Sequence, residues 1–86
     1  MLDELVIKFF EKRVIRHPSG CWEWTGGFTS QGYGDVNVWK NHQRFCRNTA
    51  HAVSWELEHG QPHSYPMELD HLCRNRGCVN PFHLEE

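Results

Sequence analysis

The chain has 86 residues and a mass of 10.2 kDa, which leaves room for one small domain with a marginal hydrophobic core. Nine basic and eleven acidic residues give a net charge of −2 with histidine neutral, which argues against a chain selected for bulk electrostatic DNA binding. The mean hydropathy of −0.70 and the short apolar runs exclude a membrane span, and no secretory signal is visible. We therefore expect a cytoplasmic protein whose four cysteines serve metal binding rather than disulfides.

The first predicted element is an amphipathic helix over residues 3–15. Asp3 can cap its N-terminus, and the segment His17-Pro18-Ser19-Gly20 breaks the pattern after it. A helix of this kind is expected to pack one face against the core. Its apolar residues recur at helical spacing and are Leu2, Leu5, Val6, Phe9, Phe10 and Val14.

Short strands are predicted next, over residues 21–25, 32–39 and 43–49. Asn41-His42 suits the turn between the last two of them. This region is locally basic, which indicates either a solvated strand face or a strip that contacts phosphates or an acidic protein surface. The candidate surface contacts here are Lys40, His42, Arg44 and Arg47, and two further candidates lie near the C-terminus, Arg74 and Arg76.

A second helix is predicted over residues 50–59, where Gly60 suits the position that follows a helix. Residues 67–72 are a short strand candidate, and residues 73–78 form a tight polar loop. Asn80-Pro81 is a good helix start, with asparagine as the cap and proline in the first helical position.

Two cysteines in the polar loop have the spacing of a metal-binding knuckle. Four residues separate Cys73 from Cys78, so both thiolates can reach one tetrahedral ion, and His83 follows five residues later. A fourth ligand has to come from far upstream, from Cys21 or Cys46, and we favour Cys21 because a strand end holds a ligand rigidly. Three thiolates and one neutral imidazole would make a closed structural zinc site, which supplies folding energy that a small core lacks.

A polar pair precedes the knuckle, Asp70-His71, and Asn80 follows it. Taken alone, such a pair is most simply a surface feature. At the end of a strand that zinc pins in place, however, His71 is well positioned as a general base, and Asp70 could hold a hard cation such as Mg²⁺. Asn80 would steady the hairpin by bonding to backbone across the loop.

These residues carry a resemblance to a known family. The stretch from Leu69 to Glu85, LDHLCRNRGCVNPFHLE, resembles the core of the HNH, or His-Me finger, endonucleases, and is most similar to the zinc-containing subgroup common in phages and homing elements. Supporting similarity lies upstream in Cys21-Trp-Glu-Trp-Thr-Gly26, Gly32-Tyr-Gly34, Ala50-His51, Trp55-Glu56 and Gly60, so that the resemblance covers roughly residues 5 to 86.

The resemblance implies an α+β protein with a small zinc-bound ββα-metal domain. Residues 1–86 would form one domain, with an N-terminal helix in 1–18, strands and a helix in 19–66, and the ββα-metal core with its knuckle in 67–86. His71 matches the general base, Asn80 the hairpin support, and Asp70 a position that can touch a catalytic Mg²⁺ or Mn²⁺. The residues that match the structural zinc ligands are Cys21, Cys73, Cys78 and His83.

The sequence departs from the family pattern in two places. The pattern continues past His83-Leu84-Glu85 into a helix with a further ligand of the catalytic metal, whereas this chain ends at Glu86; and Ala52 stands where the subgroup usually has arginine. We therefore expect a catalytically inactive HNH-like protein that binds a macromolecule as an inhibitor. An anti-CRISPR-type protein that blocks a nucleic-acid-guided nuclease in the host bacterial cytoplasm is one version.

The alternative expectation is an active, metal-dependent HNH DNA endonuclease of nicking or homing type. Its partner would be DNA, whereas the inhibitor's partner would be a protein target, and neither version implies a small-molecule substrate or a membrane. Zinc is expected in both versions, and Mg²⁺ or Mn²⁺ only in the active one.

Overall fold

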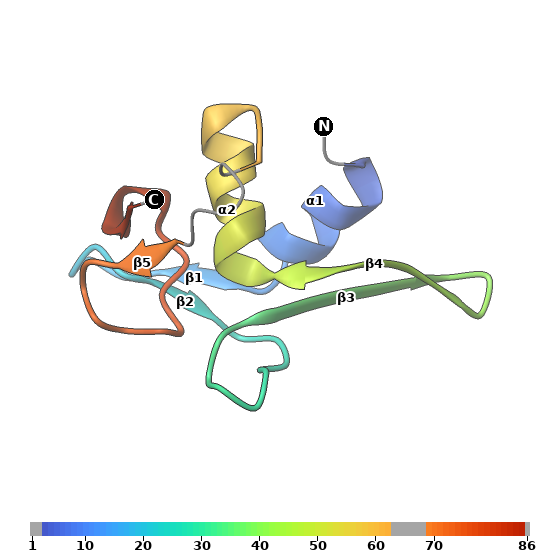
Figure 1. The fold of residues 1–86 in the computed structure, drawn as a ribbon, viewed down its shortest axis with the longest axis horizontal. Helices are drawn as coiled ribbons and strands as arrows, with labels where there is room; N and C mark the ends of the chain where they lie inside the picture. The colour runs from blue at the N-terminus through green and yellow to red at the C-terminus, as the bar shows by residue number, and fades with distance from the viewer. Residues whose placement is uncertain (1–2, 63–68, 86) are drawn as a thin grey trace.

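The computed structural model of the chain describes residues 3–62 and 69–85, apart from the side chains of Phe45 and Asp70. Within these residues the strands form two-stranded antiparallel pairs, and both α-helices lie on the same side of the longest pair (Figure 1). The elements in chain order are α1 (Glu4–Glu11), β1 (Val14–Arg16), β2 (Trp22–Trp24), β3 (Asp35–Lys40), β4 (Gln43–Thr49), α2 (Ala50–His59), β5 (Asp70–His71), a 3₁₀ turn (Pro81–His83) and β6 (Leu84–Glu85). This arrangement confirms the predicted α+β class, and no described helix has the length and apolar character that crossing a membrane requires.

The N-terminal helix is shorter than the sequence predicts. The side chain of Asp3 caps it by accepting a hydrogen bond from the Leu5 amide at 2.8 Å, as expected. The helix ends at Glu11, however, and the expectation of helix to residue 15 is wrong, because β1 pairs antiparallel with β2 from Val14 onward. Val14 and Ile15 are β-branched residues that suit a strand, and pairing with β2 decides their conformation.

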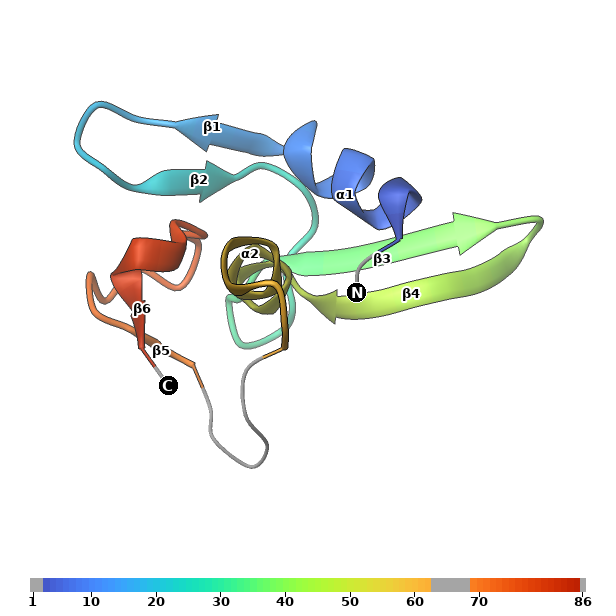
Figure 2. The same ribbon diagram turned by 90° about the horizontal axis from the view of Figure 1, so that it is seen from above.

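The β3–β4 pair is a long ribbon that ends in a tight turn. Asn41 and His42 both have positive φ, 52° and 64°, which is the conformation that suits a two-residue hairpin turn. On the face toward the helices, Val36 and Val38 are buried at 0% and 3% exposure. Seen from above, the far end of the ribbon extends beyond both helices (Figure 2).

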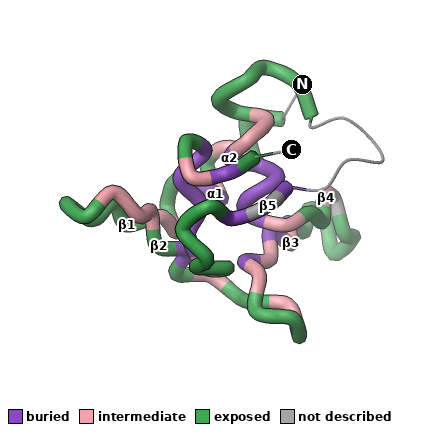
Figure 3. Tube along the Cα trace, turned by 60° about the vertical axis from the view of Figure 1, so that its left-hand side comes forward, coloured by how far each residue is buried: buried purple, intermediate pink, exposed green. Residues whose placement is uncertain are grey.

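The main core is built around Trp24, which is 1% exposed. Its ring stacks on Phe10 of α1 with the centroids 5.6 Å apart, and its indole N–H donates to the Gly27 carbonyl at 2.8 Å. The buried members of this core are Val6, Phe10, Trp24, Val36, Val38, Ala50, Val53 and Val79. Figure 3 shows the buried residues gathered in the middle of the molecule, around α2 and the neighbouring strands, with exposed segments at its margins.

Gly34 is expected to tolerate no side chain, because it lies directly against this tryptophan. A Cβ added at Gly34 would come within 2.7 Å of both Trp24 Cδ1 and Ala50 Cβ. We expect Gly34→Ala to lower the free energy of unfolding by about 1–3 kcal/mol, the cost of overpacking a core. Thermal unfolding measures it, and Gly27→Ala, whose Cβ would have no neighbour within 4 Å, is the matched control. Equal stability of the two variants would contradict this packing.

The C-terminal segment forms a small hairpin of its own. β5 pairs with β6, with Asp70 opposite Glu85 and His71 opposite Leu84. The helix expected to begin at Asn80-Pro81 is a single 3₁₀ turn, and the chain then enters β6, because Leu84 is buried in a second apolar cluster with Ala52 and Leu69. Of the strand candidate at residues 67–72, β5 covers residues 70–71, and residues 67 and 68 lie outside the described part.

Candidate metal centre and histidine site

Strand β2 brings Cys21 to the knuckle. The Val79 amide donates to the Trp22 carbonyl at 2.8 Å, and the Trp24 amide donates to the Gly77 carbonyl at 3.1 Å. Residues 22–24 therefore run antiparallel to residues 77–79, with Glu23 opposite Cys78. This pairing places Cys21, at the start of β2, beside the knuckle.

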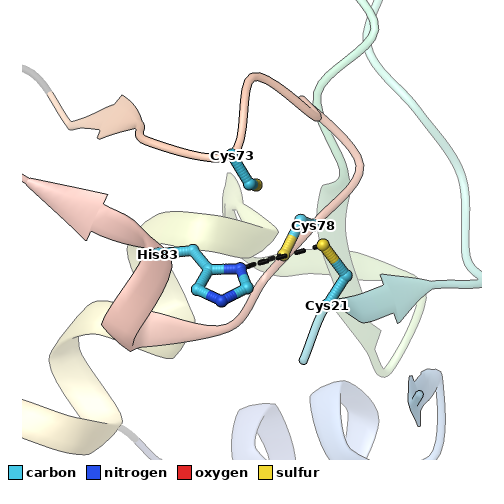
Figure 4. Close-up of side chains that lie close together, drawn as sticks. All are labelled: Cys21, Cys73, Cys78 and His83. Atoms are coloured by element: carbon cyan, nitrogen blue, oxygen red, sulfur yellow. Dashed lines mark hydrogen bonds between the residues drawn. The ribbon is translucent and has the colours of Figure 1, made fainter. Parts of the chain in front are cut away.

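The four predicted ligands converge on one point (Figure 4). The thiol sulfurs of Cys21, Cys73 and Cys78 and one ring nitrogen of His83 all lie within 4.8 Å of one another. The Nδ1 atom of His83 is 3.5 Å from Cys78 Sγ and 3.8 Å from Cys21 Sγ. Zinc–sulfur and zinc–nitrogen bonds in a tetrahedral site separate neighbouring ligand atoms by about 3.6–3.8 Å, so the set fits a zinc ion.

Local backbone features shape the knuckle between Cys73 and Cys78. The Arg74 amide donates to the His71 carbonyl at 3.0 Å, and Arg74 has a positive φ of 60°. The amide of Cys78 donates to the Asn75 carbonyl at 3.0 Å, and the Asn75 side chain accepts from the Gly77 amide at 3.0 Å. These bonds fold the loop back so that both thiols face the same side.

The remaining cysteine, Cys46, lies outside this cluster. It is half-buried on β4, opposite Val38, and packs against the main core. Burial raises the pKa of its thiol, and the nearby Glu56 carboxylate raises it further. A thiol in such surroundings is a packing residue, and the structure brings Cys21 rather than Cys46 to the other ligands.

Metal uptake is expected to release protons. The hydrogen bond with the Cys78 thiol, followed by burial, raises the pKa of the Cys21 thiol to about 11 in the metal-free protein, so this thiol is protonated at neutral pH. Zinc binds thiolates, so zinc affinity should rise with pH, with up to about three protons released per ion. Calorimetry at pH 7 in buffers of different ionisation enthalpy measures the number. Cys46→Ser should leave it unchanged, and release of fewer than one proton would contradict three thiolate ligands.

His71 lies two residues before the knuckle, and a hydrogen bond at its Nε2 atom holds the ring in place. Its side chain is 7% exposed, and its Nε2 is 3.0 Å from the carbonyl oxygen of Cys78. A carbonyl oxygen only accepts, so Nε2 carries the hydrogen in this bond and the lone pair of the neutral ring is on Nδ1. The bond thus selects the tautomer in which Nδ1 is the basic atom.

Two aromatic side chains that the sequence argument did not single out pack on His71. The rings of His51 on α2 and His71 meet edge to face with centroids 4.8 Å apart, and Tyr33 stacks on His71 at 5.8 Å. His51 is itself 8% exposed. In the sequence, these two residues lie in the segments Gly32-Tyr-Gly34 and Ala50-His51. Both segments supported the family resemblance, but no role was assigned to either residue.

Asn80 ties the exit of the knuckle to the loop before β2. Its side-chain amide donates to the Gly20 carbonyl, and its side-chain oxygen accepts from the Phe82 amide at 2.9 Å. Asn80 thereby supports the loop that carries Cys21. The backbone of Asp70, the predicted ligand of a catalytic cation, lies in β5, and its side chain is outside the described part of the structure.

The predicted basic contacts fall into two groups. Arg76 packs on Tyr33, the residue that stacks on His71. Its guanidinium lies 5.1 Å from the centre of the Tyr33 ring and donates to the Gln31 carbonyl at 2.7 Å. Arg74 is exposed on the same knuckle. The others lie on the ribbon and its turn, namely Lys40, His42, Arg44 and Arg47.

The segment that carries this site is similar in sequence to known proteins. A family model described as HNH endonuclease matches residues 48–86, which include the knuckle and His71. Protein 2.8 of Escherichia phage T7 is 36% identical over 81 residues, which are 94% of this chain and 51% of that protein. The chain thus spans about half the length of this relative, and no solved structure matches. Residues 48–86 are thus similar to the HNH endonucleases, and nearly the whole chain is similar to a phage protein.

Proposed function

We propose that this chain provides the general base of a metal-dependent HNH-type DNA endonuclease, and that His71 is that base. The observation that carries the proposal is the bond between His71 Nε2 and the Cys78 carbonyl. It fixes the ring and leaves the basic lone pair on Nδ1, which is the requirement for taking a proton from a water molecule that attacks phosphorus. The similarity of residues 48–86 to the HNH endonucleases supports the same reaction class.

The proposed zinc would orient His71 by fixing the main chain of the knuckle. Cys78 is one of the proposed ligands, and its carbonyl holds His71; Cys73, another proposed ligand, is two residues beyond His71. An ion bound to both thiolates would lock the turn that aims the imidazole. A closed site with four protein ligands has no open position for substrate, so we assign it a structural role.

A catalytic Mg²⁺ or Mn²⁺ would neutralise charge on the leaving oxygen. Asp70 is the candidate ligand by its match to the family, and Asn80 remains a support for the hairpin. This chain's own contribution is to orient the imidazole of His71 and accept the proton at Nδ1. The rings of His51 and Tyr33 restrict the movement of that imidazole.

The second candidate is a catalytically inactive binding protein, such as an anti-CRISPR-type inhibitor of a nucleic-acid-guided nuclease in the host cytoplasm. Ala52 favours it. This residue stands where the subgroup usually has arginine, and it is buried at 6% exposure in an apolar cluster with Leu69 and Leu84. The position therefore offers no charge to a phosphate, and the net charge of −2 points the same way.

Cleavage of supercoiled plasmid by the zinc-loaded chain tests the proposal. We expect conversion to the nicked form with Mg²⁺ or Mn²⁺ and none with zinc alone. Absence of nicking with both cations would contradict the endonuclease. Inhibition of a guided nuclease by the same preparation would then establish the binding protein.

A further inference from the structure

One face of the β3–β4 ribbon is covered by neither α1 nor α2. Val36 and Val38 point into the core, where α1 and α2 cover them, and the opposite face lies on the far side from both helices (Figure 1). Trp39 is 55% exposed on this ribbon, although large aromatic side chains are normally buried. This side chain is therefore accessible to a partner of the ribbon.

Positive charge is concentrated on the same segment. The ribbon with its turn, residues 35–49, holds three basic residues and one acidic residue, Asp35, so its net charge is +2, whereas the rest of the chain, with six basic and ten acidic residues, has a net charge of −4. The ribbon is therefore a basic pole on an acidic protein, which the overall charge conceals. Such a separation favours an anionic partner at the ribbon and repels it elsewhere.

The strand register places the cations and the tryptophan on the uncovered face. Asn37 pairs with Arg47 and Trp39 pairs with Arg44, alternating with the inward pairs of Val36 and Val38. The Arg44 guanidinium lies 5.3 Å from the centre of the Trp39 ring. Arg47 is 3.4 Å from the Asp35 carboxylate, and its side chain remains 52% exposed.

We propose that this outer face of the β3–β4 ribbon, with Trp39, Arg44 and Arg47, binds in the major groove of duplex DNA. The major groove is about 12 Å wide and admits a two-stranded ribbon, whereas the deep, narrow major groove of duplex RNA does not. The arginines would contact phosphates along the groove walls, and the Trp39 ring would contact base edges. From the proposed function this inference takes only that the ligand is nucleic acid, and binding can be measured without cleavage.

The test is fluorescence anisotropy with a labelled DNA duplex of mixed sequence. The protein is zinc-loaded and carries His71→Gln, and neither Mg²⁺ nor a chelator is added, so that cleavage is absent and the zinc stays bound. The double variant Arg44→Gln with Arg47→Gln should bind the duplex at least tenfold more weakly. It should also reduce the slope of log affinity against log salt by about 1.8, the value for two phosphate contacts.

A double variant of α1, Lys8→Gln with Lys12→Gln, is the matched control. It also removes two cations, and Lys8 is ion-paired with Glu4 at 3.1 Å as Arg47 is with Asp35. We expect this control to keep most of the affinity and the full salt slope. Equal weakening by the two double variants would overturn the ribbon as the binding face.

Trp39 provides a direct spectroscopic readout. It is much more exposed than Trp24, which is 1% accessible, so a groove contact should quench its fluorescence, and Trp39→Phe should remove the quenching. Duplex RNA and polyglutamate are the competing ligands. Equal affinity for duplex RNA would overturn insertion in the groove, and equal affinity for polyglutamate would identify an acidic protein surface as the partner.

Discussion

Cys73→Ser is expected to abolish stoichiometric zinc binding and to unfold the C-terminal part of the chain. Structural zinc contributes on the order of 10 kcal/mol or more in small domains, comparable to the whole net stability of a domain this size. Cys73 is exposed, so its loss removes a ligand without opening a cavity in the core. Elemental analysis should fall from one zinc per chain to far less, and thermal unfolding should lose its cooperative transition.

Cys46→Ser is the matched control for that result. Cys46 packs against the main core, so its replacement should cost some stability, but the zinc content should stay at one ion per chain. Chelator treatment of the unaltered protein should reproduce the Cys73→Ser result. Loss of zinc in Cys46→Ser together with retention in Cys21→Ser would overturn the ligand set.

The elements fixed by local chemistry follow the sequence closely. Residues 50–59 are helical as predicted, and Gly60 follows them with a φ of 75°, a conformation that favours glycine. The strand at residues 43–49 and the turn at Asn41-His42 are confirmed in the same way. In each case the signal for the element lies within or beside it, so no distant contact was needed to decide it.

The expectations that were wrong depended on distant partners. Val14 suits the stripe of a helix as well as a strand, and only its pairing with Trp24 settles the choice. Asn80 caps the next turn as predicted, but the burial of Leu84 and its pairing with His71 turn the chain into a strand. Periodicity alone carries no information about either contact.

In the candidate site, too, some features follow from local sequence and others from contacts between distant segments. The knuckle spacing is local and could be recognised in the sequence, whereas the choice between Cys21 and Cys46 depends on the pairing of residues 22–24 with residues 77–79. The packing of His51 and Tyr33 on His71 is also non-local, because these residues come from α2 and from the loop between β2 and β3. The sequence could point to His71 as a candidate base but not to the rings that pack on it.

His71→Gln is the sharpest test of the base. Glutamine keeps an N–H that can donate to the Cys78 carbonyl but has no basic nitrogen, so the hairpin should survive while proton transfer is lost. If the chain cleaves DNA as proposed, the rate should fall by about 10²–10⁴-fold, the usual contribution of a general base. Zinc content and thermal unfolding should remain close to those of the unaltered protein.

Replacement of an exposed histidine controls for general effects of losing an imidazole. His59 lies at the end of α2, where its ring stacks on Trp55 and its Nδ1 is 3.0 Å from the Trp55 carbonyl oxygen. His59→Gln should therefore leave the cleavage rate within about twofold, because its ring has no part in holding His71. Full activity in His71→Gln, with zinc still bound, would show that another group takes the proton and that the bond to Cys78 serves only to close the hairpin.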